Sequence, residues 1–323
     1  MNYNRFLKYS WFVVAYTVFV ILVGAIVRAT GSGAGCGNHW PRCDGMVIPY
    51  PEDIETLIEF GHRITSGLSG IFVLLLLVWA FRLRPVSQFV RRMAALSFLF
   101  VIVEGFLGAM LVRFELVTDN ASIARVIVIG LHLINTLILL AFLTLTAWGS
   151  QSESEANQQR PSRILKIAIL VGLILFIIMS AAGAITALGD TLFPAESLAE
   201  GIRDDFSATA HFLIRLRVYH PVIAVISSIY LFGLGYYLQS RTNSDRLDQR
   251  INWLYIVISA QIGGGIINIM LLAPVWMQVI HLLLADTMWI LLVLIASDVL
   301  LNPIGILMDN PSLSNEPRIS TVV

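Results

Sequence analysis

The chain has 323 residues, of which 57% are hydrophobic and only 13% are charged. Ordinary globular chains have roughly 45–50% apolar and about 25% charged residues, so this composition excludes an ordinary soluble domain and a disordered chain. The 21 basic residues are balanced by 21 acidic ones, which argues against nucleic-acid binding, because a phosphate backbone requires a basic surface.

Eight stretches are long and apolar enough to cross a lipid bilayer. A spanning helix needs about 20 apolar residues because the hydrocarbon core is roughly 30 Å thick, and lipid offers no partner for unpaired backbone groups. We expect the first stretch to be a retained span rather than a cleaved signal peptide. The sequence therefore predicts an all-α integral membrane protein with eight transmembrane helices, centred on Trp11–Val27, Ile58–Phe81, Met93–Val112, Ile123–Trp148, Ile164–Leu188, Val218–Leu238, Ile251–Ala273 and Trp276–Leu300.

The distribution of Lys and Arg predicts the orientation of these spans, since cytoplasmic segments carry the excess of positive charge. With a cytoplasmic N-terminus, the inner segments carry thirteen basic residues and the outer segments carry eight. Four of the thirteen lie in one short linker, at Arg82, Arg84, Arg91 and Arg92. We therefore expect a protein of the plasma membrane with both termini in the cytoplasm.

Two outer segments are long, at about 29–57 and 189–217. The first contains both cysteines, Cys36 and Cys43, and their even number, short spacing and oxidising side of the membrane favour a disulfide. Two free thiols are the alternative. The second mixes charged and apolar residues from Glu196 to Arg217, which predicts a surface helix that lies on the bilayer.

The sequence indicates an internal duplication. Gly24-Ala25-Ile26 is matched by Gly183-Ala184-Ile185, 159 positions later, and the segment Glu104–Gly108 is matched by Gln261–Gly265, 157 positions later. A polar linker at 150–162 separates the two sets of four spans. We predict two pseudo-symmetric four-helix bundles in the same orientation, formed by residues 1–150 and 151–323.

Four histidines lie inside the even-numbered spans: His62, His132, His220 and His281. Each is in the first third of a span that enters from outside, so all four are expected about 6–14 Å below the outer boundary. Packing against a neighbouring helix is one explanation for any single one, although ionisable residues in the bilayer usually mark function. Paired histidines on facing helices can be axial ligands of haem iron, whereas zinc usually takes more protein ligands. The sequence thus predicts one haem site in each half.

Charged residues adjoin these histidines. Arg63 and Arg217 are candidates to bind haem propionates, with snorkelling to the membrane surface as the alternative. Glu59 is one helical turn before His62, where a carboxylate could move a proton or stabilise a cation, or simply favour the start of a helix. The residue 158 positions after Glu59 is Arg217, so only the first half has this carboxylate. This asymmetry predicts chemistry in the first half and a permanent cofactor in the second.

Together these motifs resemble those of the haem A synthase family, eight-span enzymes that oxidise haem O to haem A for cytochrome oxidases. The resemblance covers all eight spans. It is carried by Val27–Gly33, Trp40–Cys43, Glu59–Arg63, Leu131–Leu133, His220-Pro221 and His281–Asp286 with Trp289.

The resemblance implies a role for each histidine pair. His220 and His281 would hold a permanent haem b, and His62 and His132 would border the pocket for haem O, with Glu59 as the catalytic carboxylate. The reaction implied is oxidation of the C8 methyl of the porphyrin to a formyl group. Haem O synthase and assembly factors of cytochrome oxidase are the implied partners, beside the membrane lipid and an electron partner that the sequence does not identify.

Two other classes of membrane protein are alternatives. A two-haem membrane cytochrome that takes electrons from a quinol is the leading alternative, but here each helix supplies one histidine and all four lie near one surface. A repeat-built transporter would need broken helices at mid-membrane, and the spans show no paired proline interruptions.

Overall fold

The structure is a computed structural model that describes residues 3–50, 53–83, 86–151, 161–242 and 244–301. This part of the chain is helical and contains no β-strand. Each of the eight predicted spans is confirmed as a long apolar helix. The long helices are α1 (Tyr3–Ala29), α2 (Ile54–Arg82), α3 (Gln88–Arg113), α4 (Ile123–Gly149), α5 (Arg163–Leu192), α8 (Tyr219–Gln239), α9 (Asp245–Met270) and α10 (Val275–Leu301).

Serine residues define where many of these helices begin. In α3, α4, α5 and α9 the residue before the first turn is a serine whose hydroxyl accepts a hydrogen bond from the backbone N–H three residues later. This satisfies one of the free donors at a helix start. The four residues are Ser87, Ser122, Ser162 and Ser244.

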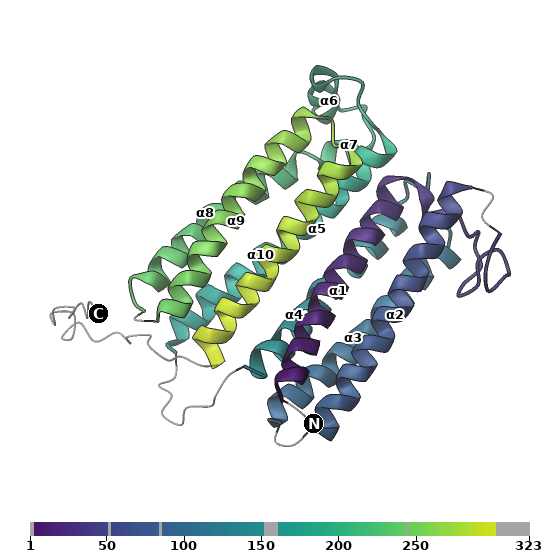
Figure 1. The fold of residues 1–323 in the computed structure, drawn as a ribbon. Coiled ribbons are helices and arrows are strands. Elements are labelled where there is room, and N and C mark those ends of the chain that lie inside the picture. The colour runs from purple at the N-terminus through teal and green to yellow at the C-terminus, as the bar shows by residue number, and fades with distance from the viewer. Residues whose placement is uncertain (1–2, 51–52, 84–85, 152–160, 243, 302–323) are drawn as a thin grey trace.

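The long helices form two groups of four that lie side by side (Figure 1). In the first group α1 and α3 each contact both α2 and α4, and in the second α5 and α9 each contact both α8 and α10. The same pairings therefore recur, as a duplication requires, although two-fold pseudo-symmetry and the domain boundary at residue 150 stay predictions. The start of α1 lies at one end of the molecule and α6 and α7 lie at the other (Figure 1).

Polar contacts join the two groups. The Arg28 guanidinium of α1 donates to the Ala187 carbonyl of α5 at 2.7 Å and to the Gln278 side chain of α10 at 2.9 Å. The Trp289 indole of α10 donates to the Leu137 carbonyl of α4 at 2.7 Å, and the Trp148 indole of α4 donates to Asp298. Each group thus supplies partners for buried polar atoms of the other.

The secondary structure of the second outer segment differs from our expectation. The predicted surface helix between Glu196 and Arg217 is instead two short helices, α6 (Leu198–Asp205) and α7 (Phe212–Leu216). Between them the Ser207 hydroxyl accepts from the Thr209 N–H, and such local bonds compete with the helical ones. In the first segment, the described residues before α2 form one 3-10 turn, η1 (Ser32–Ala34).

Orientation relative to the cytoplasm stays a prediction. Three of the basic residues counted for it, Arg84, Arg160 and Arg318, lie outside the described residues.

Candidate functional site

Each of the four span histidines faces a glycine on the preceding long helix. The ring atom Cε1 would lie 3.0 Å (His62), 3.8 Å (His132), 2.9 Å (His220) and 3.3 Å (His281) from a Cβ placed on that glycine. A Cβ would therefore collide with the His220 ring, since contacts under 3.0 Å are essentially never found for a real Cβ, and it would be unusually tight against the His62 and His281 rings. The four glycines are Gly24, Gly108, Gly183 and Gly265, which includes both pairs of positions that indicated the duplication.

The second-half histidines lie opposite each other. The ring centres of His220 and His281 are 6.5 Å apart, with the ring planes nearly perpendicular. The Nδ1 atom of His220 is 3.2 Å from the Met179 carbonyl, an acceptor that selects the tautomer with the proton on Nδ1 and leaves Nε2 unprotonated. The Nε2 atom of His281 is 3.1 Å from the Gln261 amide nitrogen, which occupies the place that a ligand of this ring would take.

The first-half histidines also face inward together. The His62 ring lies against Gly24 of α1 and the His132 ring lies against Gly108 of α3, so both rings point into the first group of helices. The Nδ1 atom of His132 is 3.4 Å from the Glu104 carboxylate of α3. Within the described residues, no cluster of three or more His, Cys, Asp or Glu side chains could hold a metal ion. Among these residues each half therefore offers two imidazoles but no three-residue cluster of metal ligands.

Glu59 is buried near the start of α2, and both of its carboxylate oxygens accept hydrogen bonds. One carboxylate oxygen accepts from the Cys36 backbone N–H at 2.7 Å, and the other accepts from the Arg63 guanidinium. Arg63 also donates to the carbonyls of His39 and Arg42, both at 2.6 Å. The carboxylate is thus fixed between its own helix and the first outer segment.

The first outer segment is closed by a disulfide and is fastened to α2 by a hydrogen bond and a close backbone contact. The predicted disulfide between Cys36 and Cys43 is confirmed. The Thr56 hydroxyl donates to the Gly35 carbonyl, and a Cβ at Gly35 would lie 2.4 Å from the backbone of Glu55. Only glycine allows this close approach, which brings the Cys36 N–H within reach of Glu59.

Arg217, the second-half counterpart of Glu59, is paired with carboxylates that the sequence analysis did not single out. It lies 3.1 Å from Asp190 at the end of α5 and 3.7 Å from Asp205 at the end of α6. Burial raises the pKa of the Asp205 carboxyl above its ordinary value, and the Arg217 charge opposes this rise. Asp190 stands two residues before the end of an apolar span, and this position is the sequence signal that could have marked it as a partner of Arg217.

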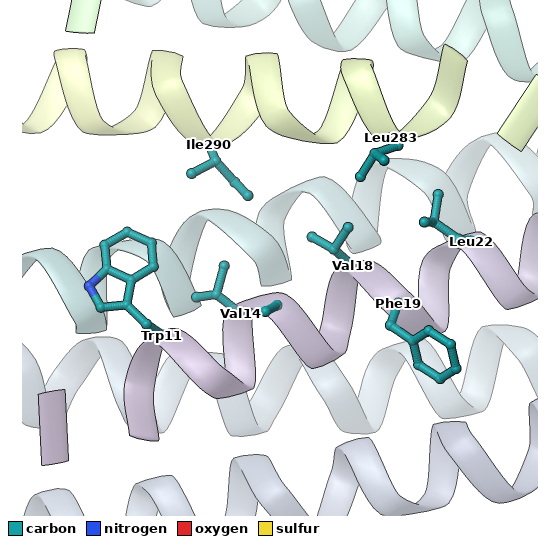
Figure 2. A pocket seen from close by; sticks show the side chains of 8 residues that line it. Trp11, Val14, Val18, Phe19, Leu22, Leu283 and Ile290 are labelled. Carbon is teal, nitrogen blue, oxygen red and sulfur yellow. The ribbon is translucent and has the colours of Figure 1, made fainter. Parts of the chain in front are cut away.

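A separate groove of about 440 Å³ lies between α1 and α10 (Figure 2). Aromatic and aliphatic side chains line it, among them Trp11, Phe19 and Ile290, and none of the predicted site residues takes part. The groove offers apolar contact but no metal ligand and no acid or base. The chemistry of the protein is therefore expected at the histidine pairs.

These features define an eight-span helical membrane protein with two inward-facing histidine pairs and one buried carboxylate beside the first pair. The sequence model of the cytochrome oxidase assembly protein family (COX15-CtaA) matches residues 8–293. The chain belongs to this family.

Named relatives agree with this membership. A Thermus thermophilus protein named protoheme IX farnesyltransferase is 44% identical over 301 residues, which are 92% of this chain and 49% of that protein. The chain thus spans about half the length of this relative. A heme A synthase from Halalkalibacterium halodurans is 49% identical over 28% of this chain and 31% of its own length. Another, from Exiguobacterium, is 29% identical over 52% of this chain and 54% of its own.

Proposed function

We propose that this protein is a haem A synthase, an oxidoreductase that converts the C8 methyl of haem O to the formyl group of haem A for cytochrome oxidase. The observation that carries the proposal is the pair of inward-facing imidazoles in each half. Only the first pair has a carboxylate, Glu59, one helical turn before one of its histidines. The resemblance of the motifs and the names of two relatives support the same reaction.

The second half fits a permanently bound haem b. Two imidazoles on opposite sides of one iron have ring centres about 6 Å apart, because metal–imidazole bonds are about 2 Å long. The observed separation of His220 and His281 is 6.5 Å, and the Met179 carbonyl holds His220 in the tautomer that a metal requires. The Gln261 amide would have to move from His281 Nε2. The haem would supply a one-electron redox centre beside the first half.

In the first half, we assign His62 and His132 to the binding of the haem O substrate and Glu59 to catalysis. Oxidation of the methyl breaks a C–H bond, with two electrons passing to an external acceptor and one proton released, and leaves positive charge on a carbon conjugated with the porphyrin. Water adds to this carbon and loses a proton, and a second such oxidation followed by loss of water gives the formyl group. A fixed carboxylate can stabilise that charge or accept a proton from the attacking water. Two donors hold Glu59 in place, so no reorientation is needed as charge develops.

Arg63 and Arg217 remain our candidates for the haem propionates. Arg63 lies within α2 and Arg217 lies between α7 and α8, and the side chain of each is 12% exposed. Each already pairs with a carboxylate of the chain, so a propionate would join an existing network.

Pigment extraction from the purified protein tests the proposed function directly. We expect haem b together with haem O or haem A, and conversion of haem O to haem A in cells that make haem O but lack a synthase of their own. A protein that contains haem b alone in both halves, and that leaves haem O unchanged in such cells, would be a two-haem cytochrome instead.

A substitution at Gly183 tests whether the second pair holds haem b. Gly183→Ala puts a methyl group 2.9 Å from the His220 ring. Overpacking of this kind costs about 1–3 kcal/mol, which corresponds to roughly 5–150-fold in affinity. We expect the haem b content, measured by the pyridine haemochrome spectrum per mole of protein, to fall.

The matched control is Gly233→Ala, because a Cβ at that α8 position meets nothing within 4 Å. The control should keep its haem. Wild-type haem content in Gly183→Ala would mean that the His220 ring does not occupy a haem-binding position.

A further inference from the structure

Glu104 is a carboxylate in the middle of a membrane-spanning helix, where an ionisable group is costly unless it has partners and a function. It lies on α3 and accepts hydrogen bonds from two side chains of α4. The Asn135 amide donates to one oxygen at 2.5 Å, and the Thr136 hydroxyl donates to the other. These two donors fix the carboxylate against α4.

The same carboxylate faces a histidine of the candidate site. Its Oε1 atom lies 3.4 Å from Nδ1 of His132, within ion-pair distance but not aligned as a hydrogen bond. Asn135 and Thr136 follow His132 on one helix by three and four residues, so all three side chains share a face of α4. A small rotation of the imidazole would complete the third bond to Glu104.

The second half has none of these three groups at the corresponding positions. The residue 157 positions after Glu104 is Gln261, and those 149 positions after Asn135 and Thr136 are Leu284 and Ala285. The Gln261 amide contacts Nε2 of His281, while the buried Nδ1 of His281 has no hydrogen-bond partner among the described residues. A negative charge and its two donors therefore occur together in one half only.

We propose that Glu104 is the positioning residue of His132, accepting its Nδ1–H so that Nε2 is presented to the iron of the substrate haem. This inference rests on the proposed function. Histidines that bind a metal usually donate their other ring N–H to a carboxylate or carbonyl, which fixes the tautomer and makes the ligand more basic. An anionic partner favours the oxidised iron, so Glu104 lowers the reduction potential of the first-half iron.

The test is a redox titration of purified protein to which protohaem IX has been added to fill the first half. Protohaem IX is used because both halves then hold the same porphyrin, and any difference in potential comes from the protein. In the wild type we expect a lower midpoint potential for the first-half iron than for the second-half iron. This comparison requires no variant. An equal or higher first-half potential overturns the inference.

The variant Glu104→Gln keeps the shape and one acceptor oxygen for α4 but removes the charge, and its amide nitrogen replaces the second acceptor. We expect the ratio of reduced to oxidised first-half iron at a given ambient potential to rise about tenfold, or about 59 mV for a one-electron couple. The second-half iron in the same molecule is the internal control and should not change. A first-half potential that stays at the wild-type value while the protein remains loaded also overturns the inference.

These results separate the two proposals. Loss of the added haem in His132→Ala, with an unchanged potential in Glu104→Gln, would leave the substrate site intact and reject the role of Glu104. Failure of the wild type to bind added haem in the first half would reject both.

Discussion

Glu59→Gln is expected to leave haem b bound and to stop the formation of haem A, with accumulation of haem O or a hydroxylated intermediate. The amide matches the carboxylate in size and can still accept from the Cys36 N–H, but it cannot carry negative charge or take a proton. Loss of a general base or acid typically costs about 10²–10⁴-fold in rate. Reversed-phase chromatography of extracted haems, with mass detection, measures the products.

The control for this experiment is Glu55→Gln, one turn earlier on α2. Glu55 is exposed, so the same chemical change at that position should leave the haem pattern as in the wild type. Because Arg63 loses a charged partner in Glu59→Gln, haem b content and thermal unfolding should be recorded in parallel. Normal production of haem A by Glu59→Gln would remove Glu59 from the mechanism.

Alanine substitutions at the four span histidines are expected to divide into two classes. His220→Ala and His281→Ala should lose the resident haem b and with it the one-electron centre, because one imidazole alone does not complete axial ligation. His62→Ala and His132→Ala should keep haem b and lose binding of added haem O. Absorbance spectra of the purified variants, before and after haem O addition, distinguish the classes.

His39→Ala is the matched control, since this exposed histidine contributes only its backbone carbonyl to the Arg63 network. It should behave like the wild type in both measurements. Loss of haem b from His62→Ala but not from His220→Ala would reverse the assignment of the two halves.

The sequence predicted the features that depend on local composition. Eight apolar runs became eight helices because lipid forces backbone groups to pair within each span. The four histidines were found by their matched positions, and the pairing of Cys36 with Cys43 followed from their spacing and location. The repeated Gly-Ala-Ile motif also has a physical explanation, since Gly24 and Gly183 make room for histidine rings.

Contacts between residues far apart in the chain could not be predicted in this way. Arg28 ends an apolar span, and nothing local in the sequence shows that its guanidinium donates to α5 and α10. The bond from the Cys36 N–H to Glu59 comes from a backbone atom, which leaves no side-chain signal. Glu104 stands inside an apolar span, but its neighbours on α4 became apparent only when the two helices were packed together.

The hydrogen bonds of Arg28 from α1 to α5 and α10 determine whether the two groups of helices can be stable apart from each other. If the first four spans were alone in lipid, the Arg28 guanidinium would lose its acceptors on α5 and α10. The last four would likewise leave the Trp289 indole N–H without the Leu137 carbonyl. Leaving a buried hydrogen-bonding group without its partner costs about 1–3 kcal/mol, and more where the group is charged. A gene split at the polar linker should therefore yield fragments that are degraded singly and survive only when both are made in the same cell.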